Sequence, residues 1–169
     1  MMPGEKNPFQ YFKAFTLVLV VAVSLVFCAI AAESSGFDYW SASDLQGYSK
    51  KLAVRMNAQK VASERLVDYG NHFLMVAHRE GSGEAELHER QSDIFIVQSG
   101  QATLLVGGRI VGGKTTAPNE IRGPSIEGGE KRKLSTGDIV HITNKVPHQL
   151  LLEPGKEFTY AVVKVDTAN

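Results

Sequence analysis

Six short apolar runs follow one another from residue 72 onward, and each is bounded by Gly, Pro, Asn or Asp. Runs of this kind between turn residues are typical of β-strands. Parallel strands need crossover helices, and the segments between the runs show no helical pattern of that length. The sequence therefore predicts an all-β domain whose antiparallel strands close into a sandwich or barrel. The predicted strands are residues 72–78, 94–97, 102–106, 139–142, 149–152 and 158–163.

One short helix is expected ahead of the strands. Residues 41–44, with the sequence SASD, offer helix-capping side chains. Apolar side chains then recur at helical spacing, at Leu45, Tyr48, Leu52 and Met56. We predict an amphipathic helix over residues 43–56 that covers a sheet edge or a barrel end.

An uncharged apolar segment spans residues 15–32, with lysines before it and a polar stretch after it. A basic flank, an apolar run and small residues at alternate positions are typical of a secretory signal peptide, here with cleavage after Ala31 or Ala32. The alternative for residues 1–32 is a retained membrane anchor, because the run reaches the lower limit for crossing a bilayer. In both cases the rest of the chain is exported, to a periplasmic or extracellular location.

Charge and cysteine content exclude several classes of protein. Lys+Arg and Asp+Glu are both 18, so no net positive charge favours nucleic acid as a partner. The only cysteine is Cys28, inside the apolar segment. Residues 33–169 therefore cannot form a disulfide scaffold, a thiolate metal centre or a cysteine nucleophile.

The exported part is predicted to be one domain. Residues 33–79 supply the helix and the first strands, and residues 80–169 form the barrel core. Within that core, glycine pairs interrupt the strand pattern over residues 107–136. We interpret these pairs as turns in a loop insertion, since no phosphate-binding fingerprint accompanies them.

Four polar side chains are the candidates for chemistry. Glu86 and His88 are two residues apart, so in an extended backbone they leave on the same face. Asp93 opens the next apolar run and shares its face with Phe95. His148 opens a later run. We expect the side chains of Glu86, His88, Asp93 and His148 to converge.

The segment around these residues resembles the first motif of the cupin superfamily, a group of small jelly-roll barrels. That motif is Gly, five residues, His-x-His, three or four residues, Glu, six residues, Gly. The second His falls on His88 and the final Gly on Gly100. Asp93 stands in the place of the Glu, Glu86 in that of the first His and Glu80 in that of the first Gly.

A later segment resembles the second cupin motif, which is Gly, five residues, Pro-x-Gly, two residues, His, three residues, Asn. It begins at Gly137 and places its His on His148. Thr143, Lys145 and Leu152 replace the Pro, the second Gly and the Asn. The resemblance covers residues 80–164 and implies a cupin-type barrel.

In cupins three histidines and a glutamate typically bind one divalent metal ion inside the barrel. The resemblance therefore implies His88 and His148 as nitrogen ligands and Asp93 and Glu86 as carboxylate ligands. Such a set suits Fe(II), Mn(II), Ni(II) or Zn(II). It also suits a metal-dependent oxygenase or isomerase acting on a small molecule.

Other interpretations remain open at this stage. Cupin barrels also serve as small-ligand or sugar-binding modules without metal chemistry. Glu86 would then hydrogen-bond the ligand, or it would belong to a solvated acidic turn. Tyr39 and Trp40 are predicted to pack against the barrel. A third class is an interaction protein, in which an edge strand or the Tyr39–Trp40 segment instead joins two barrels as a homodimer. The remaining histidines are interpreted as structural: His72, His78 and His141.

Overall fold

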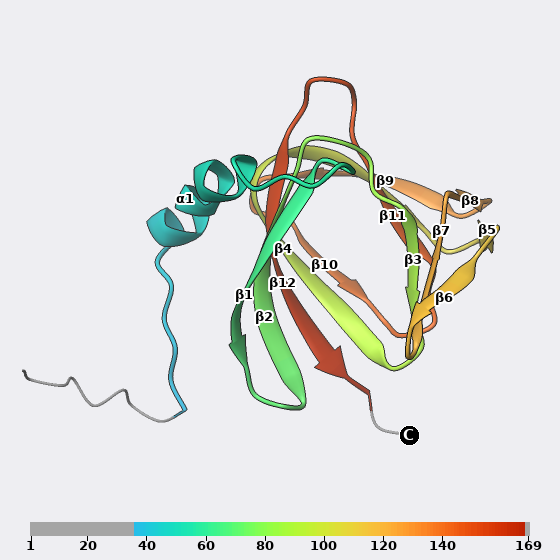
Figure 1. Cartoon of the computed structure of the whole chain (residues 1–169), viewed down its shortest axis with the longest axis horizontal. Helices are drawn as coiled ribbons and strands as arrows, with labels where there is room; N and C mark the ends of the chain where they lie inside the picture. The colour runs from blue at the N-terminus through green and yellow to red at the C-terminus, as the bar shows by residue number, and fades with distance from the viewer. Residues whose placement is uncertain (1–35, 168–169) are drawn as a thin grey trace, which may run out of the picture. The chain divides into compact units, whose positions relative to one another are not determined.

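The computed structural model describes residues 36–167. From Asp38 onward the described residues form one compact unit, in which antiparallel strands curl around a common interior (Figure 1). The elements are α1 (Ala42–Ala53), β1 (Val61–Asp68), β2 (His72–Arg79), β3 (Ala85–His88), β4 (Gln91–Val106), β5 (Arg109–Val111), β6 (Lys114–Ala117), β7 (Glu120–Gly123), β8 (Ser125–Glu127), β9 (Glu130–Ser135), β10 (Ile139–Ile142), β11 (His148–Leu151) and β12 (Phe158–Asp166). The predicted all-β fold with one short N-terminal helix is confirmed.

Strand β4 is the longest strand and joins the two sides of the barrel. The main sheet has the order β1-β2-β12-β4-β11-β3-β7-β6, and β9 and β10 also pair with β4. The first half of β4 pairs with β12 and β10, and the second half pairs with β11 and β9. Residues 94–97 and 102–106, predicted as separate strands, are therefore two parts of one strand.

The core lies between the inward faces of the strands. The residues of β4 that belong to the main core cluster are Phe95 and Val97 before Gly100 but Ala102 and Leu104 after it, so the inward face changes parity along the strand. A register irregularity in the pairing with β12 accompanies this change. The interior on this side is completed by side chains of β12, namely Phe158, Tyr160 and Val162.

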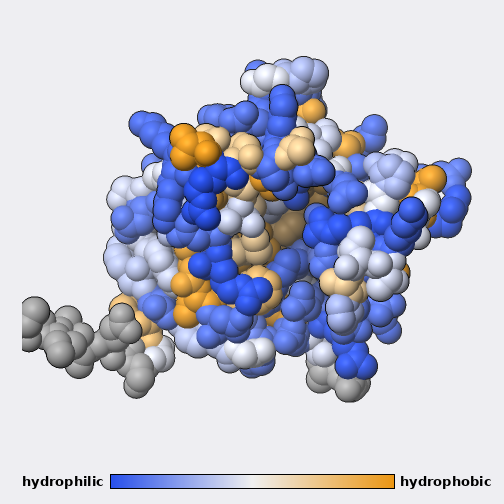
Figure 2. Space-filling view, in the orientation of Figure 1, coloured by the Kyte–Doolittle hydropathy of each residue, from blue (hydrophilic) through white to orange (hydrophobic). Residues whose placement is uncertain are grey.

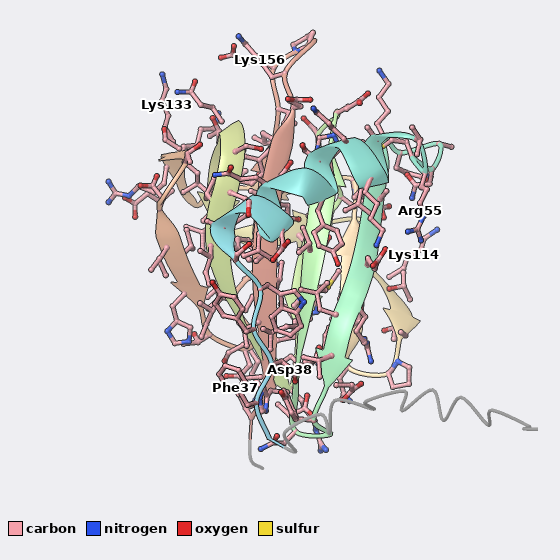
Figure 3. The ribbon with its side chains drawn as sticks, turned by 90° about the vertical axis from the view of Figure 1, so that its left-hand side faces the viewer. Phe37, Asp38, Arg55, Lys114, Lys133 and Lys156 are labelled. Carbon is pink, nitrogen blue, oxygen red and sulfur yellow. The ribbon has the colours of Figure 1, made fainter. Side chains whose placement is uncertain are left out.

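Helix α1 packs on the outer face of the sheet, which Figure 3 shows from that side. Its N-terminus carries a capping box, in which Ser41 and Asp44 satisfy each other's backbone N–H groups. Leu52 is fully buried against Ala62 and Val76. The helix thus covers apolar surface that the barrel interior does not use. It ends three residues earlier than predicted.

Residues 107–136 differ from the predicted loop insertion, because they contain the five strands β5 to β9. Strand β7 pairs with β3, and β9 pairs with β4, so this segment builds part of the barrel wall. The strands are short, and most of their side chains are exposed, so no apolar alternation marks them in the sequence. Strand β1 was also absent from the predicted strands, and three of its eight residues are charged: Glu64, Arg65 and Asp68.

Two further expectations concern the N-terminal region. Tyr39 is 74% exposed, so the prediction that it packs against the barrel is wrong. The predicted signal peptide or anchor lies outside the described residues. No helix in the described part of the chain is long and apolar enough to cross a membrane.

Gly100 is predicted to be required for the path of β4. It has a φ of 81°, and a Cβ placed there would lie 2.0 Å from the carbonyl oxygen of Glu157. Gly155 has a similar φ of 75° but nothing within 4 Å of a Cβ. Gly155→Ala should cost only the backbone strain of about 1 kcal/mol, and Gly100→Ala should cost at least about 2 kcal/mol more.

Equilibrium denaturation of the two variants measures this difference. Equal losses in the free energy of unfolding would show that the close approach of Gly100 to Glu157 does not constrain the strand.

Candidate metal centre

The four predicted site residues come together from three strands. Glu86 and His88 lie on β3, Asp93 begins the inward face of β4, and His148 is the first residue of β11. Strand β11 pairs with both β3 and β4, and His148 is the register partner of Glu86. The hydrogen-bonding pattern of the sheet therefore places these side chains beside one another, as the spacing in the sequence predicts.

The distances within the cluster are short. Asp93 Oδ2 lies 3.4 Å from His88 Nε2 and 3.4 Å from His148 Nε2. Glu86 Oε2 lies 3.6 Å from His88 Nε2. Ligand atoms of Glu86, His88 and His148 are all within 4.8 Å of one another. The side chains of both histidines are 5% exposed and that of Asp93 is 2% exposed, so the cluster is shielded from bulk water.

The ring of His148 is oriented by the backbone that leads into β11. Its Nδ1 lies 3.1 Å from the carbonyl oxygen of Val146, which can only accept, so Nδ1 donates. The other nitrogen, Nε2, is buried and has no hydrogen-bond partner among the described residues. A buried polar atom without a partner is costly, so Nε2 of His148, which faces Asp93, is available to a ligand.

Glu86 is held by two arginines. Arg122 on β7 is the register partner of Glu86, and its Nη1 donates to Oε1 over 3.0 Å. Arg79 on β2 approaches the same oxygen to 3.5 Å and donates from Nε to the hydroxyl of Tyr160. Glu86 therefore points into the barrel, and the interpretation of a solvated acidic turn at this position is wrong.

Lys164 on β12 is a site residue that the sequence analysis missed. It is the register partner of Asp93, and its Nζ lies 2.6 Å from Asp93 Oδ1 and 2.9 Å from His88 Nε2. A signal for it exists, because counting in twos along β12 from the buried Phe158 reaches residue 164. Arg79 and Arg122 were missed as well. Arg79 continues the inward series of Met75 and Ala77 one residue past the predicted strand, and Arg122 lies outside the predicted strands.

The electrostatics of the cluster favour charged carboxylates. Burial raises the pKa of Glu86, but His88 and the nearby guanidinium groups outweigh it and lower the pKa to about 2. Burial also raises the pKa of Asp93, but His148, His88 and Lys164 hold it well below its usual range. Burial lowers the pKa of His88, but Asp93 and Glu86 raise it to about 9. At neutral pH both carboxylates are therefore charged and His88 carries a proton, which a metal ion would have to displace from Nε2.

A cavity of about 290 Å³ lies beside the cluster. Figure 2 shows the molecule hollowed between the side of β1 and β2 and the side of β3 and β7. The cavity is lined by side chains that contact the cluster and by apolar core residues. Those that bear charge are Arg79, Glu86, Asp93, Arg122 and Lys164. His88 also borders a second cavity of about 430 Å³ next to Glu120 and Asp166.

The other histidines lie outside the cluster. His78 is fully buried, but it shares a face with Val76, which packs against α1, and its Nδ1 lies 2.7 Å from Thr159 Oγ1. His72 belongs to the same outward series, and His141 is exposed. None of the three lines the two cavities beside the cluster, as their structural interpretation predicts.

Comparisons with known proteins establish the fold. The sequence matches no protein-family model and no curated protein. The structure is similar to TT1209 from Thermus thermophilus, with 17% identity, 70% of this chain and 94% of that chain covered, and a TM-score of 0.50. It is also similar to a protein with a double-stranded β-helix domain from Klebsiella pneumoniae, with 16% identity, 76% and 90% covered, and a TM-score of 0.51. The predicted cupin-type barrel is thereby confirmed as the fold.

The stability of the barrel in acid should depend on Glu86. Its pKa is about 2 in the folded protein against an ordinary value of 4.5, so the stability it contributes is present above pH 4.5 and is lost as the pH falls toward 2. We expect Glu86→Gln to lower the free energy of unfolding at pH 7 by about 1 to 3 kcal/mol and to flatten its decline between pH 4.5 and 2.

Urea titrations across this pH range measure the effect, with Glu84→Gln as the control. Glu84 is exposed on the same segment, and its substitution removes the same charge. An unchanged acid profile in Glu86→Gln would contradict the assignment.

Proposed function

We propose that this chain binds one divalent metal ion inside the barrel, through His88, His148 and at least one of Glu86 and Asp93. The observation that carries the proposal is the buried Nε2 of His148, which has no partner among the described residues and faces the other three side chains. A metal ion would satisfy this lone pair. The ion would be Fe, Mn, Ni or Zn, which accept imidazole and carboxylate ligands together.

The spacing of the donor atoms fits a metal ion. Two ligands about 2.1 Å from one ion, at the tetrahedral angle, stand roughly 3.4 Å apart. Asp93 Oδ2 stands 3.4 Å from the Nε2 atoms of both histidines. The two carboxylates would neutralise a divalent charge in a buried site. The Nδ1–H of His148, held by Val146, fixes the ring with Nε2 toward the ligand position.

The proposed activity is isomerisation of a small molecule, or its oxidation with dioxygen as the oxidant. The metal ion, when bound, would act as a Lewis acid that polarises an oxygen of the substrate. The cavity of about 290 Å³ limits the substrate to a small molecule. Arg79 and Arg122 would orient polar groups of that molecule, and the carboxylate that does not bind the ion would serve as a general base.

A second candidate is a small-ligand or sugar-binding module without metal chemistry. The ammonium group of Lys164 supports it, because it already neutralises Asp93 and contacts His88. In that case the polar groups around the cavity would hydrogen-bond the ligand directly. Ligand-induced thermal stabilisation that persists in EDTA distinguishes this candidate from the metal site.

Export remains part of the proposal and rests on the apolar segment of residues 15–32. The absence of cysteine from residues 33–169 is compatible with an oxidising compartment. The proposed partner is a small molecule and not a nucleic acid. We also propose a membrane tether through the N-terminal segment and the formation of a homodimer.

Elemental analysis of the purified full-length protein tests the metal proposal. We expect close to one equivalent of metal, after reconstitution with Fe(II), Mn(II), Ni(II) or Zn(II) if needed. The double variant His88→Ala/His148→Ala should lose it, because two of the proposed ligands are gone. The matched control is His72→Ala/His141→Ala, which removes two histidines outside the cluster.

Retention of metal by the first double variant, or its absence from the reconstituted wild-type protein, would refute the proposed site. Circular dichroism of each variant confirms that the barrel is folded.

A further inference from the structure

The inward face of β12 ends in a charge. Phe158, Tyr160 and Val162 are buried in the core, and Lys164 follows them in the same series with its side chain only 15% exposed. An ammonium group at such a position loses hydration, which costs free energy, so its contacts with the protein must compensate for that cost. They are the 2.6 Å contact with Asp93 Oδ1 and the 2.9 Å contact with His88 Nε2.

These contacts engage atoms that a metal ion would need. An imidazole nitrogen has a single lone pair, so His88 Nε2 cannot bind a metal ion while that lone pair holds a proton or accepts a hydrogen bond from Lys164. The charge of Lys164 also neutralises Asp93, which weakens the attraction of that carboxylate for a second cation. Glu86 and His148 make no hydrogen bond to Lys164 among the described residues. Half of the cluster is therefore engaged by the protein's own cation.

We propose that Lys164 is an internal cation that competes with the metal ion for His88 and Asp93 and thereby sets the metal affinity of the site. This proposal rests on the metal function proposed above. A metal ion first meets Glu86 and His148, which Lys164 does not contact, and acquires the other two ligands only when the ammonium group moves aside. The cavity of about 290 Å³ borders Lys164 and provides space for that movement.

Removing the competing charge should tighten metal binding. In Lys164→Met the side chain keeps its length and loses its charge, so Asp93 and His88 lose the cation that contacts them. We expect the affinity for Zn²⁺ to rise at least about tenfold, which corresponds to about 1.4 kcal/mol. If the methionine variant does not fold, Lys164→Gln serves as a second neutral variant. Its amide group retains a hydrogen-bond donor for Asp93.

Isothermal titration of the metal-free full-length protein with Zn²⁺ measures the affinities. The matched control is Lys156→Met, because Lys156 is exposed on the loop between β11 and β12 (Figure 3) and loses the same charge away from the cluster. It should bind Zn²⁺ as the wild-type protein does. Tighter binding by the Lys164 variants alone supports the competition.

A measurement on the wild-type protein gives an independent readout. Displacement by Zn²⁺ should free the amine of Lys164, so its acylation by a lysine reagent, followed by mass spectrometry, should become faster when Zn²⁺ is added. Acylation of Lys156 should not change. An unchanged rate at Lys164 in protein shown to hold Zn²⁺ would contradict the displacement.

The outcomes separate this proposal from the one on which it rests. Equal Zn²⁺ affinity in the wild-type protein and both Lys164 variants would overturn the competition and leave the metal site standing. No Zn²⁺ binding by any of them would overturn the metal site and the competition with it. Binding by the Lys164 variants alone would mean that the internal cation excludes the metal from the wild-type protein.

Discussion

The pairing of β4 with four other strands is the constraint on which the barrel depends. Its first half belongs with β12 and β10 and its second half with β11 and β9, so one continuous backbone carries both sides of the structure. Gly100 lies near the middle, where the chain approaches the backbone of Glu157 more closely than any side chain would permit. The same strand supplies Asp93 to the cluster and Phe95 to the core. Fold and site are therefore fixed by one element.

The sequence predicted those strands in which inward-facing and outward-facing side chains alternate in character. Glu86, His88 and Asp93 could be placed on inward faces because a strand has a period of two, and His148 because an apolar run follows it. Residues 107–136 could not be recognised as strands, because their side chains are largely exposed and carry no apolar period. Tyr39 was misplaced because aromatic character indicates a tendency to be buried but does not indicate a partner.

The basic side chains of the site illustrate a second limit. Arg122 faces Glu86, and Lys164 faces Asp93, only because β7 and β12 are the neighbours of β3 and β4. Such cross-strand partners depend on sheet order and register, which a single sequence does not contain. The two carboxylates of the site could thus be predicted from the sequence, but the basic side chains that neutralise them could not. Buried carboxylates without that compensation would be strongly destabilising.

The pairing of Lys164 with Asp93 also bears on how the barrel closes. A slip of β12 by one residue along β4 would turn every side chain of β12 to the opposite face. Val163 or Val165 would then stand opposite Asp93, Lys164 would leave the interior, and a buried carboxylate would lose its cation. Uniformly apolar strands can slide with little penalty, whereas this one cannot. The charges of the site therefore favour the observed register of β12 on β4.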